Sequence, residues 1–191
     1  MIADKFLPEG FKAQIRAEIG ENNAEILFSA LCGEPETSLR LNVRKKTKVL
    51  PYAVEKDVEW CKSGYYLPER PNFTLNPLLH AGVFYVQDAS SMVYEAIVQS
   101  LFKDSPVQAC DLCAAPGGKT TAILNALPDG STMLANEFIS SRAKILAENL
   151  CKYGYPETVV TNCDTSRLSK MKEQFDMVAV DAPCSGEGMM R

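Results

Sequence analysis

The sequence predicts an α/β fold with a parallel sheet in its C-terminal half, preceded by a smaller α+β region. Three observations lead to this fold class. After Pro106, apolar runs of strand length alternate with longer stretches of helical periodicity, and the connections between them are short. Glycines and a Pro-Asp-Gly turn stand where the expected helices begin or end. Alternating strands and helices form right-handed crossovers, which build a parallel sheet.

Four strands and two helices alternate in this C-terminal half. The expected strands are 107–114, 131–138, 157–163 and 175–182, and the expected helices are 118–127 and 140–154. A complete doubly wound sheet has about six strands. The pattern therefore predicts a chain that is truncated relative to a complete domain. The alternative is a compact four-stranded protein whose last strand is an unprotected edge.

The first half of the chain has a mixed pattern. Apolar periodicity predicts helices near 11–19 and 26–31, each followed by glycine, and a third helix from about 90 to 102. Residues 37–43 alternate polar and apolar side chains, which indicates a strand. We therefore expect an N-terminal α+β domain for RNA or substrate over 1–75, a connecting segment with a helix over 76–105, and the parallel sheet over 106–191.

Charge excludes a protein that coats nucleic acid by bulk electrostatics, because the formal net charge of the 191 residues is −4. One local basic cluster remains, between positions 40 and 48. Its members are Arg40, Arg44, Lys45, Lys46 and Lys48. Charge alone favours a solvated strand end and turn over a nucleic-acid patch for this cluster.

The seven cysteines favour reduced thiols over zinc or redox chemistry. Cys110 and Cys113 form a single CxxC pair, but no second pair follows, and His80 is the one histidine, so a four-ligand zinc site is poorly supplied. Cys110 also falls inside a strand rather than in the loop that a thioredoxin-like motif requires. With no apolar run long enough for a membrane span and no signal-peptide pattern, we expect a cytoplasmic protein without a membrane or metal partner.

The loop after the first parallel strand, DLCAAPGGKTT (111–121), superficially matches a phosphate-binding loop. A Walker motif needs glycine five residues before the Gly-Lys pair, and that position holds Cys113. A side chain there disturbs the turn that points backbone amides at phosphate. A P-loop NTPase is therefore the less favoured alternative, and the dinucleotide fingerprint is absent as well.

Acidic residues end three of the four parallel strands. They are Glu137, Asp164 and Asp181. Glu137 comes nineteen residues after Gly118, where an acid accepts hydrogen bonds from ribose hydroxyls in nucleotide-binding sheets. A single strand-end Asp often just caps the following helix. Three such acids beside a glycine loop indicate a nucleoside pocket.

Long motifs in this sequence closely resemble the Sun/nucleolar-protein family of S-adenosylmethionine-dependent RNA cytosine-5 methyltransferases. DLCAAPGGKTT (111–121) and DAPCSGEGMMR (181–191) resemble its catalytic-domain motifs, and HAGVFYVQDASSM (80–92) resembles the stretch that leads into that domain. LPEGF (7–11) and SLRLN (38–42) resemble its bacterial ribosomal RNA branch, the F-type small-subunit enzymes. The resemblance implies the first four strands of a Rossmann-like class I methyltransferase sheet, and small-subunit ribosomal RNA, rather than DNA, as the partner.

The resemblance also assigns roles to residues of this chain. It implies that one loop wraps the methionine end of S-adenosylmethionine, with Cys113, Ala114, Ala115, Pro116, Gly117, Gly118 and Lys119 as its members. Glu137 would hold the ribose hydroxyls, Asp164 would accept from the adenine amino group, and Asp181 would lie between methyl donor and target base. Lys119 would either stabilise the cytosine adduct or cap a helix.

Cys184 follows Asp181 and Pro183 and is the obvious candidate for a nucleophilic thiol. Methylation at carbon 5 of cytosine needs a thiolate at carbon 6, because carbon 5 alone is a poor nucleophile. The resemblance implies instead that Cys184 assists product release and that the attacking cysteine belongs to a later motif. We therefore expect this chain alone not to turn over. A non-catalytic RNA-binding or ribosome-assembly protein that keeps the fold is the alternative.

Overall fold

A computed structural model describes residues 7–45, 47 and 50–184, and it divides into two compact units. The first consists of residues 7–36 together with Cys184, and the second of residues 37–183. The expected basic residues Lys46 and Lys48 and the end of the last motif, residues 185–191, lie outside the described residues. Within the described part, no helix has the length and apolar character needed to cross a bilayer.

The first unit is a pair of helices that pack through aromatic and aliphatic side chains. α1 (Glu9–Ile19) and α2 (Glu21–Leu31) meet at Gly20, whose φ of 82° breaks the helical path between them. Phe11 of α1 contacts buried Phe28 of α2, with ring centroids 6.2 Å apart. The structure confirms both helices that the apolar periodicity predicts.

An antiparallel sheet opens the second unit, with strand order β2-β3-β1-β4. Its strands are β1 (Thr37–Leu41), β2 (Lys56–Val58), β3 (Cys61–Leu67) and β4 (Phe84–Val86), and η2 (Phe73–Leu75) and α3 (Pro77–His80) connect β3 to β4. Phe73 and Phe84 are buried in the core of this sheet, where the Tyr52 ring meets both edge-on. β4 and α3 come from the expected connecting segment, so that segment contributes directly to this sheet.

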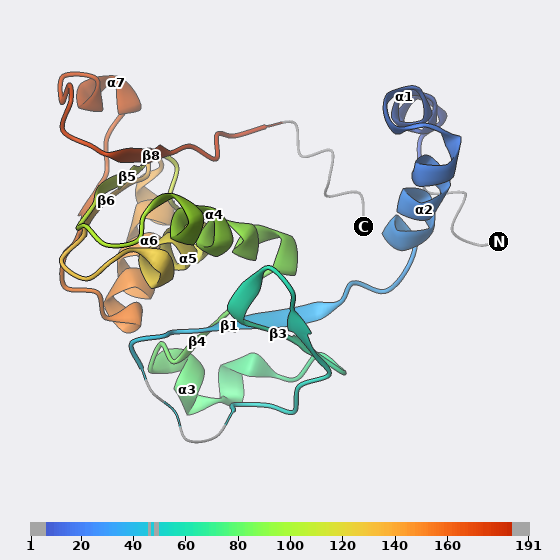
Figure 1. Cartoon of the computed structure of the whole chain (residues 1–191), viewed down its shortest axis with the longest axis horizontal. Coiled ribbons are helices and arrows are strands. Elements are labelled where there is room, and N and C mark those ends of the chain that lie inside the picture. Colours follow the sequence, from blue (N-terminus) through green and yellow to red (C-terminus); the bar gives the residue numbers. More distant parts are fainter. Residues whose placement is uncertain (1–6, 46, 48–49, 185–191) are drawn as a thin grey trace. The chain divides into compact units, whose positions relative to one another are not determined.

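A parallel sheet that includes β5, β6 and β8 forms the rest of the second unit (Figure 1). Its strand order is β7-β6-β5-β8. Its strands are β5 (Gln108–Asp111), β6 (Thr132–Asn136), β7 (Thr158–Thr161) and β8 (Met177–Ala179), and its helices are α5 (Gly118–Ala126), α6 (Ser140–Tyr153) and the short α7 (Thr165–Leu168). All pairings are parallel. The chain thus winds outward from β5 to β7 and returns to the other side of β5 with β8. This order confirms the first four strands of a Rossmann-like sheet.

One apolar core joins the parallel sheet to its helices. Inward-facing Ala109 and Met133 of the central strands contact the apolar sides of α5 and α6, represented by Ile123 and Leu146. These four residues are at most 1% exposed. η3 (Ala89–Met92) and α4 (Val93–Leu101) precede the sheet, and Val98 of α4 joins the same core. β8 lies at one edge, where Val178 is 51% exposed.

Arg40 of β1 corrects the expectation of a solvated basic cluster, because its side chain is fully buried. Each of its five N–H donors has an acceptor within hydrogen-bonding distance. Nε donates to Gln87 Oε1 at 3.1 Å, and Nη1 donates to Thr121 O at 3.0 Å and to the Tyr153 hydroxyl at 2.7 Å. Nη2 donates to Thr121 Oγ1 at 2.6 Å and to Gly118 O at 3.3 Å. The guanidinium therefore ties the antiparallel sheet to α5 and α6.

A neutral relay links Arg40 to a second buried charge, the carboxylate of Glu95 on α4. The Tyr153 hydroxyl, which accepts from Arg40, donates to Asn125 Oδ1 at 2.6 Å. Asn125 Nδ2 and the Ser63 hydroxyl both donate to Glu95 Oε2, at 3.2 and 2.7 Å. Burial raises the pKa of Tyr153 above its usual range, which keeps this hydroxyl a neutral donor. Two opposite charges thus share one hydrogen-bonded network inside the unit.

The turn before β4 approaches α6 too closely for any side chain. Gly82 has a φ of 65°, and a Cβ there would collide with the carbonyl oxygen of Lys152. Asn42 Nδ2 spans the same junction, donating to Gly82 O at 3.0 Å and to Tyr153 O at 2.7 Å. Lys45 also donates to the Lys152 carbonyl. Arg40 and Lys45 of the basic cluster therefore help to dock the antiparallel sheet on α6, whereas Arg44 pairs with Asp129 and Glu157.

We expect Arg40→Met to lower the free energy of unfolding by about 3 kcal/mol or more, because it strands several buried acceptors. Urea denaturation followed by circular dichroism measures this loss. The matched control is Arg167→Met, since Arg167 is exposed on α7. Equal stability of the two variants would contradict the structural role of Arg40.

Candidate active site

The glycine loop, residues 112–117, follows β5, and the buried side chain of Asp111 at the end of β5 holds it by hydrogen bonds. This carboxylate is 2% exposed. Its Oδ1 accepts from the Cys113 amide at 3.3 Å, and its Oδ2 accepts from Thr120 Oγ1 at 2.7 Å. Burial raises the pKa of Asp111, while the hydrogen bonds from Thr120 and Cys113 lower it. Asp111 therefore connects the strand, the loop and the first turn of α5.

Side chains from α6 and β4 hold the outer part of the glycine loop. Arg142 donates to Ala115 O at 2.8 Å, and Asn149 donates to Pro116 O at 2.8 Å. The Tyr85 hydroxyl lies 3.4 Å from the same Pro116 oxygen. Gly117 then adopts a φ of 111°, a conformation that L side chains rarely adopt, and α5 begins at the next residue. Contacts from α6 and β4, which lie far from the loop in the sequence, thus help to set the loop conformation.

Asn136, at the end of β6, fixes the spacing of three neighbouring strand ends. It is fully buried, and its backbone carbonyl accepts from the Ala114 amide at 2.8 Å. Its Nδ2 donates to Leu112 O at 3.2 Å and to Cys163 O at 3.0 Å. Its Oδ1 accepts from Thr161 Oγ1 at 2.9 Å. The carboxyl ends of β5, β6 and β7 are therefore held as one platform.

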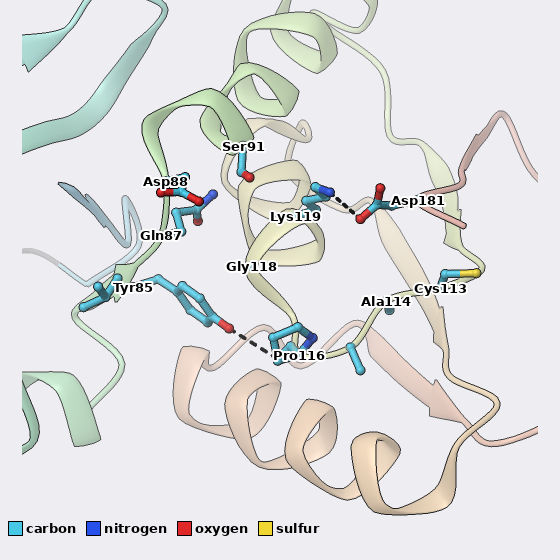
Figure 2. A pocket seen from close by; sticks show the side chains of 12 residues that line it. Tyr85, Gln87, Asp88, Ser91, Cys113, Ala114, Pro116, Gly118, Lys119 and Asp181 are labelled. Atoms are coloured by element: carbon cyan, nitrogen blue, oxygen red, sulfur yellow. Dashed lines mark hydrogen bonds and ion pairs between the residues drawn. The ribbon is translucent and has the colours of Figure 1, made fainter. Parts of the chain in front are cut away.

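A cavity of about 320 Å³, here called the first cavity, opens between the glycine loop, β8 and the segment that follows β4. Figure 2 shows Tyr85, Gln87 and Asp88 on one side of it and Cys113 and Ala114 on the other. The strand order reverses between β5 and β8, and open α/β sheets bind their ligands in the crevice at such a switch point. The remaining lining residues are Val86, Ser91, Ala115, Pro116, Gly118, Lys119 and Asp181.

Lys119 and Asp181 form an ion pair across the first cavity (Figure 2). Lys119 is the second residue of α5, and Asp181 follows β8 by two residues. The ammonium also lies 5.8 Å from the centroid of the Tyr94 ring. Both side chains remain partly exposed, at 30% and 53%. The lysine that would contact phosphate in a P-loop thus already has a carboxylate partner.

The Cys113 thiol reports a negative electrostatic field beside the first cavity. Its pKa is raised first by burial and then by the carboxylates of Asp111, Glu137 and Asp181, with Arg142 opposing them. A field that disfavours a thiolate also disfavours a phosphate and favours a cation. The electrostatics here are therefore suited to a sulfonium or an ammonium group.

Glu137 and Asp164 follow β6 and β7 but do not line the first cavity. Glu137 is buried, its Oε1 accepts from the Ile139 amide at 2.8 Å, and its Oε2 lies 3.5 Å from Arg142 Nη1. Asp164 is exposed and caps α7, accepting from the Ser166 amide at 2.8 Å. Hydrogen bonding by Ser166, through its side chain and then its backbone amide, lowers the pKa of Asp164. The structure therefore brings the loop, Lys119 and Asp181 together at one cavity and leaves these two acids along the adjoining strand ends.

The cysteines differ sharply in burial, and all seven are free. Burial within β5 raises the pKa of Cys110 to about 11. Cys151 and Cys184 are exposed, and Cys184 is grouped with the first unit. Among the described residues, no group of His, Cys, Asp and Glu side chains is arranged to hold a metal ion.

Sequence reasoning missed three residues that shape the site. Asp111 gives the remaining parallel strand a carboxylate at its end, so all four strands have one, and its position at the end of an apolar run was the available signal. Asn136 is likewise a polar residue at the end of a strand, here β6, and this position was its available signal. Gln87 lines the cavity through a hydrogen bond from Arg40, a contact across 47 positions that has no local signal.

Comparisons with known proteins agree with this geometry. A family model described as 16S rRNA methyltransferase RsmB/F matches residues 101–191, and one described as the N-terminal domain of 16S rRNA methyltransferase RsmF matches residues 7–89. Ribosomal RNA small subunit methyltransferase F of Salmonella arizonae is 36% identical over 97% of this chain, and that of Aliivibrio fischeri is 35% identical over 97%. The chain spans 41% and 42% of the length of these relatives.

Solved structures share the fold. A methyltransferase homolog from Pyrococcus horikoshii has a TM-score of 0.75 at 24% identity, covering 90% of this chain and 58% of that one. The structure of NSun6 from the same organism with SFG has a TM-score of 0.72 at 16% identity, covering 93% and 71%. The chain thus has the fold of the Rossmann-like methyltransferases. With both domain models matched, the chain belongs to the RsmB/F family of 16S rRNA methyltransferases, which confirms the family resemblance of the motifs.

We expect iodoacetamide at pH 8 to modify Cys151 and Cys184 quickly and Cys110 at least a hundredfold more slowly. A rise in the pKa of Cys110 from 9.0 to about 11 reduces its thiolate fraction about a hundredfold, and burial blocks access as well. Peptide mass spectrometry after timed quenching measures the three rates. Rapid modification of Cys110, or its oxidation to a disulfide with Cys113, would contradict this expectation and support a redox function for the CxxC pair.

Proposed function

We propose that this chain binds S-adenosylmethionine in the glycine loop and forms the cofactor-binding part of a ribosomal RNA cytosine-5 methyltransferase. The observation that carries the proposal is the cavity beside the glycine loop, at the point where the strand order reverses, with the Lys119–Asp181 pair across it. S-adenosylmethionine would supply an electrophilic methyl group on a positively charged sulfonium. That charge suits a site surrounded by carboxylates, whereas a nucleoside triphosphate would be repelled.

The residues at hand fit such a cofactor. Space is tight at Gly118, the residue that follows the glycine loop, since a Cβ there would lie 3.3 Å from the Tyr85 ring. Glu137 keeps a carboxylate at the end of β6, where it would accept hydrogen bonds from ribose hydroxyls. Asp164 uses one oxygen to cap α7, and its other oxygen would accept from an adenine amino group. These roles extend the site from the first cavity along the strand ends.

Asp181 and Lys119 would act at the reactive end of the site. The target cytosine would enter the first cavity, where Asp181 can accept a proton or hydrogen bond from the ring and Lys119 can balance developing negative charge. Neither Cys110 nor Cys113 suits the nucleophile, because burial raises the pKa of both thiols. The exposed Cys184 would assist product release, as the family resemblance implies.

Small-subunit ribosomal RNA is the proposed partner, and the cytoplasm the proposed location. The names of the relatives support this choice, because both are ribosomal RNA small subunit methyltransferases. The specificity for carbon 5 of cytosine rests on the motifs of the glycine loop and of residues 181–184. A non-catalytic RNA-binding protein with the same fold remains the second candidate. A P-loop NTPase is disfavoured, because Asp181 pairs with the lysine that would hold phosphate.

Calorimetric titration with S-adenosylhomocysteine and with Mg-ATP tests the proposal, and we expect binding of the first alone. Glu137→Gln keeps the acceptor for the Ile139 amide but removes the charge, and it should weaken S-adenosylhomocysteine binding about tenfold. Glu59→Gln, a change at an exposed position, is the matched control. Binding of Mg-ATP without S-adenosylhomocysteine would reject the proposed function.

The adenine contact of Asp164 has its own test. Asp164→Ser keeps a side chain that can cap α7 but is too short to reach a ligand, so the melting temperature should stay within about 2 °C. We expect the unchanged chain to prefer S-adenosylhomocysteine over S-inosylhomocysteine, which lacks the amino group, by about tenfold. The variant should lose this preference. A variant that retains the full preference would remove Asp164 from the site.

A further inference from the structure

A second cavity, of about 380 Å³, lies beside the first in the same compact unit. It opens between the antiparallel sheet with its connecting helices and the C-terminal half of α6. Arg70, Phe73 and His80 line it from the first side, and Asn149 and Lys152 line it from the second. None of the roles proposed above uses this cavity.

The two cavities share the Tyr85 side chain as a common wall. Tyr85 and Val86 line both of them. The Tyr85 hydroxyl reaches Pro116 O in the glycine loop (Figure 2), and Asn149, which lines the second cavity, donates to the same oxygen. A ligand in the second cavity would therefore lie beside Tyr85, the residue that also lines the first. The two sites are adjacent in the way that consecutive units of one polymer would require.

The second cavity has the opposite charge to the first. Among the described residues that line it, Arg70 and Lys152 are cationic and none carries a carboxylate. The first cavity, by contrast, is lined by two carboxylates, Asp88 and Asp181, and one cation, Lys119, so its formal charge is negative. This basic lining stands out in a chain whose formal net charge is −4. An anionic ligand is therefore favoured in the second cavity alone.

Both cations can be reached by a ligand. Arg70 is exposed, with its guanidinium carbon 5.9 Å from the centroid of the Phe73 ring. Lys152 pairs with Glu148 at 2.6 Å on the surface of α6, but Glu148 is 65% exposed. Exposed pairs of this kind are weak, so a phosphate can replace the glutamate. An aromatic wall next to two cations is the arrangement that single-stranded nucleic acid requires.

We infer that the second cavity binds the nucleotide next to the target cytosine in single-stranded RNA. Arg70 and Lys152 contact its phosphate, and its base stacks on the Tyr85 ring, which separates it from the target base. This inference rests on the proposed function, in which the target base occupies the first cavity. The inference adds the path of the RNA strand to the proposed function. The target nucleotide enters the first cavity, and the neighbouring nucleotide is bound in the second cavity.

Fluorescence anisotropy with a fluorescein-labelled single-stranded octaribonucleotide containing one cytosine tests the inference. Arg70→Gln and Lys152→Gln should each raise the Kd for this RNA about five- to tenfold and reduce the slope of log Kd against log salt by about one. Lys172→Gln, a change at an exposed lysine outside both cavities, should change neither value. Tyr85→Phe should keep RNA affinity, while Tyr85→Leu should lower it about tenfold.

Calorimetry with S-adenosylhomocysteine on the same variants separates this inference from the proposed function. We expect Arg70→Gln and Lys152→Gln to bind S-adenosylhomocysteine as the unchanged chain does. Unchanged RNA affinity in both variants, or no RNA binding by the unchanged chain, overturns the inference even where S-adenosylhomocysteine binds. An octaglutamate peptide that binds as tightly as the RNA, and loses affinity in the same variants, overturns it in favour of an acidic protein segment.

Discussion

The buried guanidinium of Arg40 is the interaction on which the rest of the second unit depends. A buried charge is costly unless every donor is satisfied, and Arg40 meets this condition with five hydrogen bonds. Its acceptors include the Gly118 carbonyl and both oxygens of Thr121, in the first turns of α5. The start of α5 sets the direction of Lys119 and closes the glycine loop. A residue of the antiparallel sheet thus determines the geometry of a site on the parallel sheet.

The same docking explains why two cavities of opposite charge can coexist in a small protein. β4 brings Tyr85 to the boundary, and the glycine loop supplies Pro116 as its partner on the other side. Asp88 and Asp181 line the cavity on one side of this boundary, and Lys152 of α6 and Arg70, which precedes α3, line the cavity on the other. The separation depends on a rigid junction, which the contact of Gly82 with Lys152 and the bonds of Asn42 provide.

Local signals predict the sheet and the loop well, and the reason is physical. Apolar runs, helical periodicity and terminal glycines act within a few residues, so β5 to β8 and the intervening helices follow from the sequence. Asp164 illustrates the limit of such reasoning, since an acid at a strand end can cap a helix and also serve a ligand. Arg40 illustrates a stronger limit. Nothing local distinguishes it from Arg44, whose guanidinium packs over the Tyr155 ring with its centre 4.1 Å from the ring centroid.

The sequence separation within the Arg40 network bears on how the protein is made. Arg40 bonds to Gly118 and Tyr153, which follow it by 78 and 113 residues. At a synthesis rate of roughly 5 to 20 residues per second, these acceptors are synthesised on the order of ten seconds after Arg40. The ribosome therefore delivers the sheet first, and α6 closes the unit when it emerges.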